Sequence, residues 1–323
     1  MWALWSSPDG IFFMSSVMFS IITPCLNART FIAEAIESVL AQQIPDVEHI
    51  IVDGGSADGT LEILRKFPHL IVVSEPDKGM YDAVNKGIKI ARGEWIGLLN
   101  ADDLYPPGSL KQTSDAVAGS PSIQAVNGGF AVFEGNGNER TIVRVSPSIG
   151  ADEFWYRIVR GSTAPNTWFI RRSNFESYGF YDSRYRYSAD REMILRLAVV
   201  GVRPLSLSGV NYYFRQHEGS ATFSRQDSRH SKRGDIRMKI ALEALIIQEE
   251  YLASTSTPTG MRKELRAGHS ATSYKLASTA LYHRNWGGFL RGVWHGCRHN
   301  VFWPLIFLQM ASRRLRKEFT GHE

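Results

Sequence analysis

Two adjacent carboxylates, Asp102 and Asp103, end an apolar run that begins at Trp95. Hard cations such as Mg2+ and Mn2+ prefer carboxylate oxygens, and Mg2+ commonly takes one or two carboxylates together with water and substrate phosphates. A bound cation would also remove the repulsion between the two neighbouring charges. The pair therefore indicates a divalent metal site, although an Asp before a Pro-Pro turn also caps a helix or stabilises the turn in many proteins.

Other polar side chains occupy positions suited to a charged ligand. Asp53 closes the apolar stretch "HIIVD" and precedes two glycines, whose missing side chains allow a ligand to approach the backbone. Asp190 opens a helical pattern, where the helix dipole favours an acid and supplies an ordinary structural explanation. Arg215, His217 and residues 220–222 lie in a stretch rich in donors for phosphate oxygens. Each of these signals is weak when taken singly.

The composition is that of a globular chain from a reducing compartment. Its 323 residues allow one large domain with a smaller appendage. Cys25 and Cys297 lack metal-ligand spacing, which argues against a disulfide framework and against structural zinc. The first 17 residues lack the charged start and unbroken apolar stretch of a signal peptide, so we expect a loose extension, or translation begun upstream of Met14 or Met18. No stretch of 18 or more apolar residues predicts a membrane span.

A parallel sheet is needed to bring the candidate residues together, and the sequence predicts one. Apolar, β-rich stretches at 18–24, 47–53, 69–75 and 94–100 alternate with helical periodicity. This alternation indicates an α/β domain with helices on both faces of the sheet. Ligands of such sheets bind beyond the carboxyl ends of the strands. The polar residues expected there are Thr23, Pro24, Asn27, Asp53, Glu75, Asp77, Asn100, Asp102 and Asp103.

Later stretches predict a mixed sheet followed by helices. Residues 123–134 and 140–146 have the pattern of an antiparallel pair, and 166–172 and 211–224 predict further strands. A helix is predicted over 188–201, and residues from about 227 onward have helical patterns. We therefore expect a loose extension over 1–17, a main domain over 18–225 and a helical, basic region over 226–323.

Four stretches occur in this order: "SIITPCLNARTFIAEAIESVLAQ", "HIIVDGGSADGT", "EPDKGMYDAVNKGIKIARGEWIGLLNADD" and "SADREMILRLAVVG". Together they closely resemble glycosyltransferase family 2, in particular bacterial polysaccharide-biosynthesis members of the colanic-acid type. The resemblance covers roughly residues 18 to 220. It implies the GT-A fold, a Rossmann-like, mixed and mainly parallel sheet flanked by helices, here with a C-terminal helical extension. It also implies inverting transfer of a sugar from a nucleoside diphosphate, with Mn2+ or Mg2+ as cofactor, to a saccharide or lipid-linked acceptor in surface polysaccharide or glycolipid biosynthesis.

The resemblance assigns donor-binding roles to individual residues. Residues 18–120 are expected to bind the nucleotide and 121–225 the acceptor. "NADD" matches the DxD motif of the family with Asn100 at its first position, which leaves Asp102 and Asp103 as ligands for metal and ribose. Arg215 and His217 are implied to lie over the diphosphate when their loop closes. The other implied donor-binding residues are Thr23, Pro24 and Asn27 beside the nucleotide, Asp53 at the base or ribose, and Asp77, Lys78 and Gly79 closing the pocket.

Asp190 is the catalytic residue that the resemblance implies. It matches the acid of the catalytic "ED" motif, although Ala189 stands where the family has Glu. Transfer passes through an oxocarbenium-like transition state, in which negative charge builds on the diphosphate while the acceptor hydroxyl loses a proton. Asp190 is therefore expected to take that proton, and the metal to stabilise the leaving group.

Two other functions are alternatives. A nucleotidyltransferase also uses a parallel sheet and metal carboxylates, but the first strand here has no Gly-rich, basic phosphate loop. A sugar-nucleotide or polysaccharide-binding protein without catalysis is favoured by Ala189 alone. We expect no nucleic-acid partner.

The C-terminal tail carries a separate signal. Residues 284–317 contain seven Lys or Arg and no Asp or Glu, interleaved with Trp and Phe. This composition suits a segment lying on an anionic leaflet, and equally a core helix with a solvated basic end. We expect a cytoplasmic protein, with peripheral contact to the cytoplasmic face of the membrane through 284–317 as a hypothesis.

Overall fold

A computed structural model describes residues 17–150, 153–160, 164–218, 232–300, 302–305 and 307–309. The expected loose extension (except residue 17), residues 220–222 and the basic end of the tail from 310 lie outside the described residues. The chain forms two compact units that interleave along the sequence. The first unit takes residues up to 148, 166–183 and 203–215, and the second takes 149–165, 184–202 and the residues from 216 onward.

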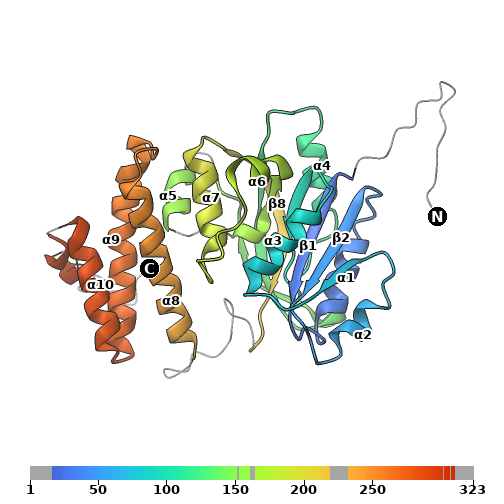
Figure 1. Ribbon diagram of the computed structural model, residues 1–323, viewed down its shortest axis with the longest axis horizontal. Coiled ribbons are helices and arrows are strands. Elements are labelled where there is room, and N and C mark those ends of the chain that lie inside the picture. Colours follow the sequence, from blue (N-terminus) through green and yellow to red (C-terminus); the bar gives the residue numbers. More distant parts are fainter. Residues whose placement is uncertain are drawn as a thin grey trace. The chain divides into compact units, whose positions relative to one another are not determined.

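The first unit is built on one mixed sheet of eight strands in the order β3-β2-β1-β4-β7-β5-β6, with β8 pairing β5. Figure 1 shows the neighbouring strands β1 and β2 of this sheet. The first four strands are parallel, β7 and β6 are antiparallel to their neighbours, and β8 runs parallel to β5. This confirms the expected mixed, mainly parallel sheet. The strands are β1 (Phe19–Cys25), β2 (Val47–Asp53), β3 (Ile71–Ser74), β4 (Trp95–Leu98), β5 (Ala125–Glu134), β6 (Thr141–Ser146), β7 (Trp168–Arg171) and β8 (Pro204–Arg215).

Helices of the first unit follow the strands as the apolar periodicity predicts. In the first of them, Ile32, Ala35, Ile36 and Val39 recur at helical spacing and are buried. The helix after β7 was not predicted from the sequence. The helices are α1 (Ile32–Leu40), α2 (Thr60–Leu64), α3 (Met80–Ile90), α4 (Ser109–Val117) and α6 (Arg172–Tyr178), with 3-10 turns at Gly137–Glu139 and Pro165–Thr167.

The strand register brings the loops to a common edge. Cys25 of β1 lies opposite Asp53 of β2, and Asp53 lies opposite Ser74 of β3. Behind this edge, β1 is buried along its whole length, and Phe19 and Ile21 pack in a core with Trp95 and Phe169. Burying each such side chain contributes roughly 1.5–3 kcal/mol, so the edge rests on a firmly packed sheet.

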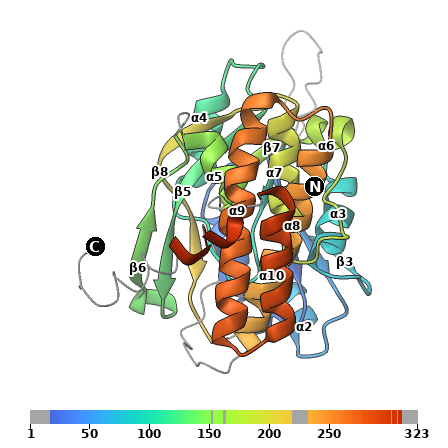
Figure 2. The same cartoon turned by 90° about the vertical axis from the view of Figure 1, so that its left-hand side faces the viewer.

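The second unit is helical. It contains α5 (Phe154–Arg160), α7 (Ala189–Val199), α8 (Lys232–Ala253), α9 (Thr259–Tyr282) and α10 (Trp286–His299). Helices α8, α9 and α10 run side by side (Figure 2). Glycine allows the close approach of α9 and α10, because a Cβ at Gly292 would lie 2.7 Å from the backbone nitrogen of Ala277. Among the described helices, none has the length and apolar character to cross a membrane.

Candidate functional site

Asp53 is held at the end of β2 by a ring of donors. Its Oδ2 accepts hydrogen bonds from the backbone amides of Gly55 and Ser56, both at 3.1 Å, and from the hydroxyl of Ser74 at 2.7 Å. Burial opposes ionisation, but the hydrogen bonds from Ser56, Ser74 and Gly55 lower the pKa of Asp53 below its ordinary value. The carboxylate is therefore fixed in place and ionised at neutral pH.

The loop after β1 is fastened to the loop after β2. The amide of Asn27 donates to Ser56 Oγ at 2.7 Å, and the amide of Ala57 donates to Asn27 Oδ1 at 3.0 Å. Asn27 adopts a left-handed conformation with φ of 52°, which Asn tolerates better than most residues. The two loops thus form one rigid surface at the sheet edge.

The turn containing Asp77, Lys78 and Gly79 lies against the same surface. A Cβ at Gly54 would collide with the carboxylate of Asp77, so the missing side chain permits this contact. Asp77 Oδ1 accepts from the amide of Gly79 at 2.7 Å, at the start of α3. Four of the sequence-predicted residues, Asn27, Asp53, Asp77 and Gly79, are therefore brought together by the first three strands.

Thr23 and Pro24 are buried within β1. The hydroxyl of Thr23 hydrogen-bonds Nε2 of His49 at 2.9 Å. Burial, with a smaller effect of the His69 charge, lowers the pKa of His49 to about 3, so its ring is neutral. These two residues shape the strand beneath the loops.

Asp103 follows β4 and is the centre of a buried hydrogen-bond network. Its Oδ2 accepts from Asn100 Nδ2 at 2.9 Å and from the hydroxyl of Tyr212 at 2.8 Å, and its Oδ1 accepts from the amide of Arg215 at 2.8 Å. The Tyr212 oxygen in turn accepts from Asn166 Nδ2 at 3.0 Å. Burial and the charge of Asp102 raise the pKa of Asp103, while these hydrogen bonds act in the opposite direction.

Arg215 ends β8, and its buried guanidinium donates hydrogen bonds to several acceptors of the protein. Its Nε donates to the carbonyl of Asp102 at 2.8 Å, and its Nη2 to Glu34 Oε2 at 3.1 Å. Further bonds join Nη1 to the carbonyl of Gly135 and to Asn136 Oδ1. The guanidinium also lies 4.6 Å from the ring centroids of Phe31 and Phe133. In this conformation the guanidinium supports the β4 loop.

Asp102 and Asp103 differ in their fitness as metal ligands. Both oxygens of Asp103 already accept hydrogen bonds, and the residue is 3% exposed. Asp102 is half-buried and has its backbone carbonyl fixed by Arg215. One carboxylate combined with substrate phosphates is an ordinary ligand set for Mg2+. The residues at the end of β4 therefore fit a divalent cation with Asp102 as its protein ligand and Asp103 as support.

Asp190 and His217 belong to the second unit. Asp190 lies in the first turn of α7, half-buried, and its Oδ1 accepts from the amide of Arg191 at 2.6 Å. Ala189 is fully buried as the first residue of that helix. His217 is half-buried and follows β8 by two residues.

Tyr212, Asn166 and Glu34 were missed by the sequence interpretation. Tyr212 is fully buried, and its phenol meets Asp103 across 109 residues of chain. Glu34 was hidden inside an apolar helix pattern, although it accepts bonds from Arg215 and Arg140. One signal for this network was available in the sequence. Tyr212 lies in an apolar strand, and a buried Tyr hydroxyl usually needs a hydrogen-bond partner.

The chain is similar in sequence to a known family and to several of its members. Residues 20–179 match the family described as Glycosyl transferase family 2. A PGL/p-HBAD biosynthesis glycosyltransferase of Mycobacterium tuberculosis is 31% identical over 189 residues, which cover 57% of this chain and 70% of that protein. The uncharacterized glycosyltransferase EpsJ of Bacillus subtilis is 28% identical over 221 residues, covering 64% of this chain and 63% of that one.

Similar folds occur among solved structures. A mannosyltransferase of Pyrobaculum calidifontis, solved in complex with GDP-Man and Mn2+, has a TM-score of 0.58 at 18% identity. The match covers 88% of this chain and 87% of that one. At such identity the similarity concerns the fold, which is that of GT-A glycosyltransferases.

Proposed function

Because the chain belongs to glycosyltransferase family 2 and is a glycosyltransferase of polysaccharide or glycolipid biosynthesis, we propose that it transfers a sugar with inversion from a nucleoside diphosphate to a saccharide or lipid-linked acceptor. The observation that carries the proposal is the end of β4, where Asp102 is backed by the buried network of Asp103, Asn100, Tyr212 and Arg215. The network fixes the backbone at Asp102, which supports Asp102 as the protein ligand of a diphosphate-bound cation.

In this proposal, the sugar donor binds at the edge of the sheet where the parallel strands β1 to β4 end. Asp53 binds the base or ribose, with Asn27 and the Asp77–Gly79 turn on either side. Asp102 holds Mn2+ or Mg2+, and a cation there stabilises the charge that develops on the departing diphosphate. The fold relative solved with GDP-Man and Mn2+ supports a nucleotide-sugar donor and a metal of this class. Arg215 acts as a positioning residue for Asp102 and Asp103, and His217 contacts the diphosphate.

Asp190 is the proposed base. As the acceptor hydroxyl oxygen forms a bond to the anomeric carbon, its proton moves to the Asp190 carboxylate and the bond to the diphosphate oxygen breaks. Attack from the face opposite the leaving group inverts the anomeric centre. The short hydrogen bond from the Arg191 amide fixes the carboxylate for this step.

Asp190→Asn tests this assignment. Asn keeps an acceptor for the Arg191 amide but cannot accept the proton, so turnover should fall about a hundredfold or more while donor affinity stays within about twofold. Release of nucleoside diphosphate and calorimetric donor titration measure the two quantities. NMR of the product gives the anomeric configuration.

Asp115→Asn is the matched control, because Asp115 is an exposed helix carboxylate paired with Lys111. It should leave turnover unchanged. Equal losses of turnover and donor affinity in Asp190→Asn would contradict the role of Asp190 as base, and a product with retained configuration would contradict inversion.

Helix α10 is the proposed contact with a membrane on its cytoplasmic side. Trp286, Leu290 and Trp294 recur every four residues and are 65%, 64% and 57% exposed. Arg284, just before the helix, and Arg291, within it, are exposed and supply positive charge. A helix with an exposed aromatic face and flanking Arg suits the interface of an anionic bilayer.

Flotation of the full chain with vesicles containing anionic lipid tests this contact. The double variant Trp286→Ser and Trp294→Ser should float at least fivefold less than the unchanged chain, because it loses the apolar area that enters the interface. The control is Val143→Ser with Val145→Ser, which changes exposed apolar side chains on β6. Equal flotation of both double variants would refute the contact.

A further inference from the structure

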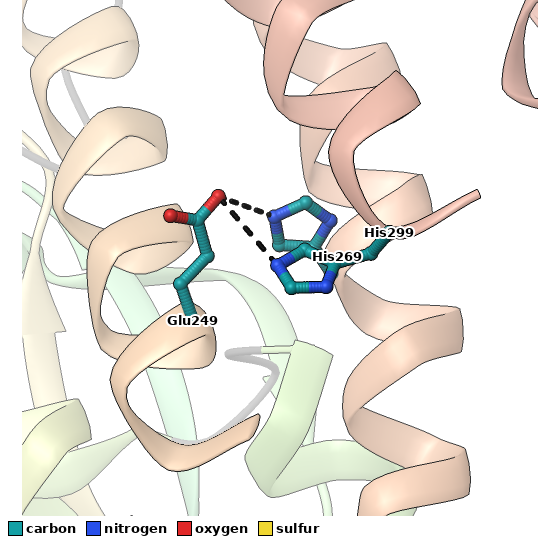
Figure 3. A group of neighbouring side chains, drawn as sticks. All are labelled: Glu249, His269 and His299. Carbon is teal, nitrogen blue, oxygen red and sulfur yellow. Dashed lines mark hydrogen bonds and ion pairs between the residues drawn. The ribbon is translucent and has the colours of Figure 1, made fainter. Parts of the chain in front are cut away.

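Helices α8, α9 and α10 bring one carboxylate and three imidazoles together. Glu249 Oε1 lies 3.1 Å from His269 Nε2, 2.7 Å from His295 Nδ1 and 4.0 Å from His299 Nε2. Figure 3 shows the rings of His269 and His299 directed at the same oxygen of Glu249. The ligand atoms of Glu249, His269 and His299 all lie within 4.8 Å of one another.

We propose that Glu249, His269 and His299 bind a divalent transition-metal ion of the zinc type. Two imidazole nitrogens and one carboxylate oxygen suit Zn2+, whereas Mg2+ and Ca2+ prefer oxygen ligands alone. In a tetrahedral zinc site, neighbouring ligand atoms lie about 3.4 Å apart. Side-chain shifts of about an ångström therefore convert the present spacing into a site with one position left for water or another ligand.

The surroundings prepare these groups for a metal. His269 is fully buried, and its ring approaches Glu249 Oε1 through Nε2, the atom that would bind the metal. Arg298 donates from Nη1 to Glu249 Oε2 at 2.8 Å, which leaves Oε1 facing the imidazoles. His295 bonds Oε1 itself and orients the carboxylate, as outer partners do in many metal sites.

The spacing of the two cysteines argued against structural zinc, but the proposed site contains no cysteine. These ligands come from three separate helices, and one of them, His269, is fully buried. An ion held by all three helices would fasten α10 to α8 and α9. The site is independent of the donor cation, since none of its ligands belongs to the first unit.

Equilibrium dialysis of the full, tag-free chain against Zn2+ tests the site. We expect one retained equivalent, a higher Tm with Zn2+, and the visible absorption of a nitrogen- and oxygen-bound ion when Co2+ replaces Zn2+. His299→Gln should lower Zn2+ affinity at least tenfold and remove the rise in Tm. Because His299 is exposed, this variant should fold, and circular dichroism checks that it does.

His283→Gln is the matched control, since His283 follows α9 outside the cluster. It should bind Zn2+ as the unchanged chain does, and so should Asp102→Asn, which alters the donor edge alone. The proposal is overturned if the unchanged chain retains no Zn2+, or if His299→Gln retains it with equal affinity. Loss of the equivalent in Asp102→Asn would also overturn it, by placing the ion at the donor edge.

Discussion

At the scale of single residues, Asp103 is a buried carboxylate held in place by hydrogen bonds from its neighbours. Its two oxygens take three donors from Asn100, Tyr212 and Arg215, so the residue is bonded as a structural centre. A buried carboxylate is costly unless such donors surround it. Asn100, which the sequence predicted to bind the donor, holds this carboxylate in place through its Nδ2.

Tyr212→Phe removes one donor from the buried Asp103 carboxylate and the acceptor shared by Asn166 Nδ2 and the backbone amide of Asn100. We expect a loss of about 1–3 kcal/mol in the free energy of unfolding, because buried groups lose their partners. Urea denaturation measures this loss. Tyr105→Phe, which removes a hydroxyl bonded to the carbonyl of Leu98, is a comparison in the same core.

An unfolding free energy in Tyr212→Phe equal to that of the unchanged chain would show that the stability of the Asp103 network does not depend on the phenol.

The sequence predicted that Asp102 and Asp103 end a strand, because an apolar run and a turn are local signals. It could not predict the partners of Asp103, since Tyr212 and Arg215 reach it from 109 and 112 residues away.

At the scale of the single helix, α10 has one buried face and one exposed face of different composition. Gly288, Gly292 and Gly296 are buried, and Gly288 and Gly292 meet Ala280 and Ala277 of α9. The large apolar side chains Trp286, Leu290 and Trp294 are exposed instead. The glycine spacing allows close packing of two helices, and it leaves the aromatic face available for a bilayer.

Gly292→Val tests the close packing of α10 on α9. A Cβ there would lie 2.7 Å from the Ala277 nitrogen, so the larger side chain must push the helices apart. We expect a loss of about 1–3 kcal/mol, the ordinary cost of overpacking, measured by denaturation of the full chain. Gly287→Val is the control, because a Cβ at Gly287 meets only ordinary contacts. Similar stability of the two variants would contradict the packing described.

The elements differ in how far the sequence could predict them. Strands β1 to β4 and the helices after them were predicted because alternating apolar patterns are local. The parallel pairing of β8 with β5 was not, since it joins Ala125 to Pro204 and depends on the whole sheet. Helices α5 and α6, which have seven residues each, were missed.

At the scale of the whole molecule, the residues proposed for function belong to both units. The residues proposed for donor binding, apart from His217, belong to the first unit, and the proposed base Asp190 belongs to the second. The sequence suggested a division near residue 225, in chain order. Contacts instead group α5 and α7 with the C-terminal helices, which no linear pattern along the sequence reveals.

The most direct measurement is the thermal shift of the unchanged chain and of Asp102→Asn with a panel of nucleoside diphosphates, with Mn2+ or with a chelator. A ligand that binds the folded state raises Tm. We predict that one nucleoside diphosphate raises the Tm of the unchanged chain only when Mn2+ is present, and that Asp102→Asn loses this rise. An equal rise in Asp102→Asn, or no rise with any nucleotide of the panel, would contradict a metal-dependent donor site at the end of β4.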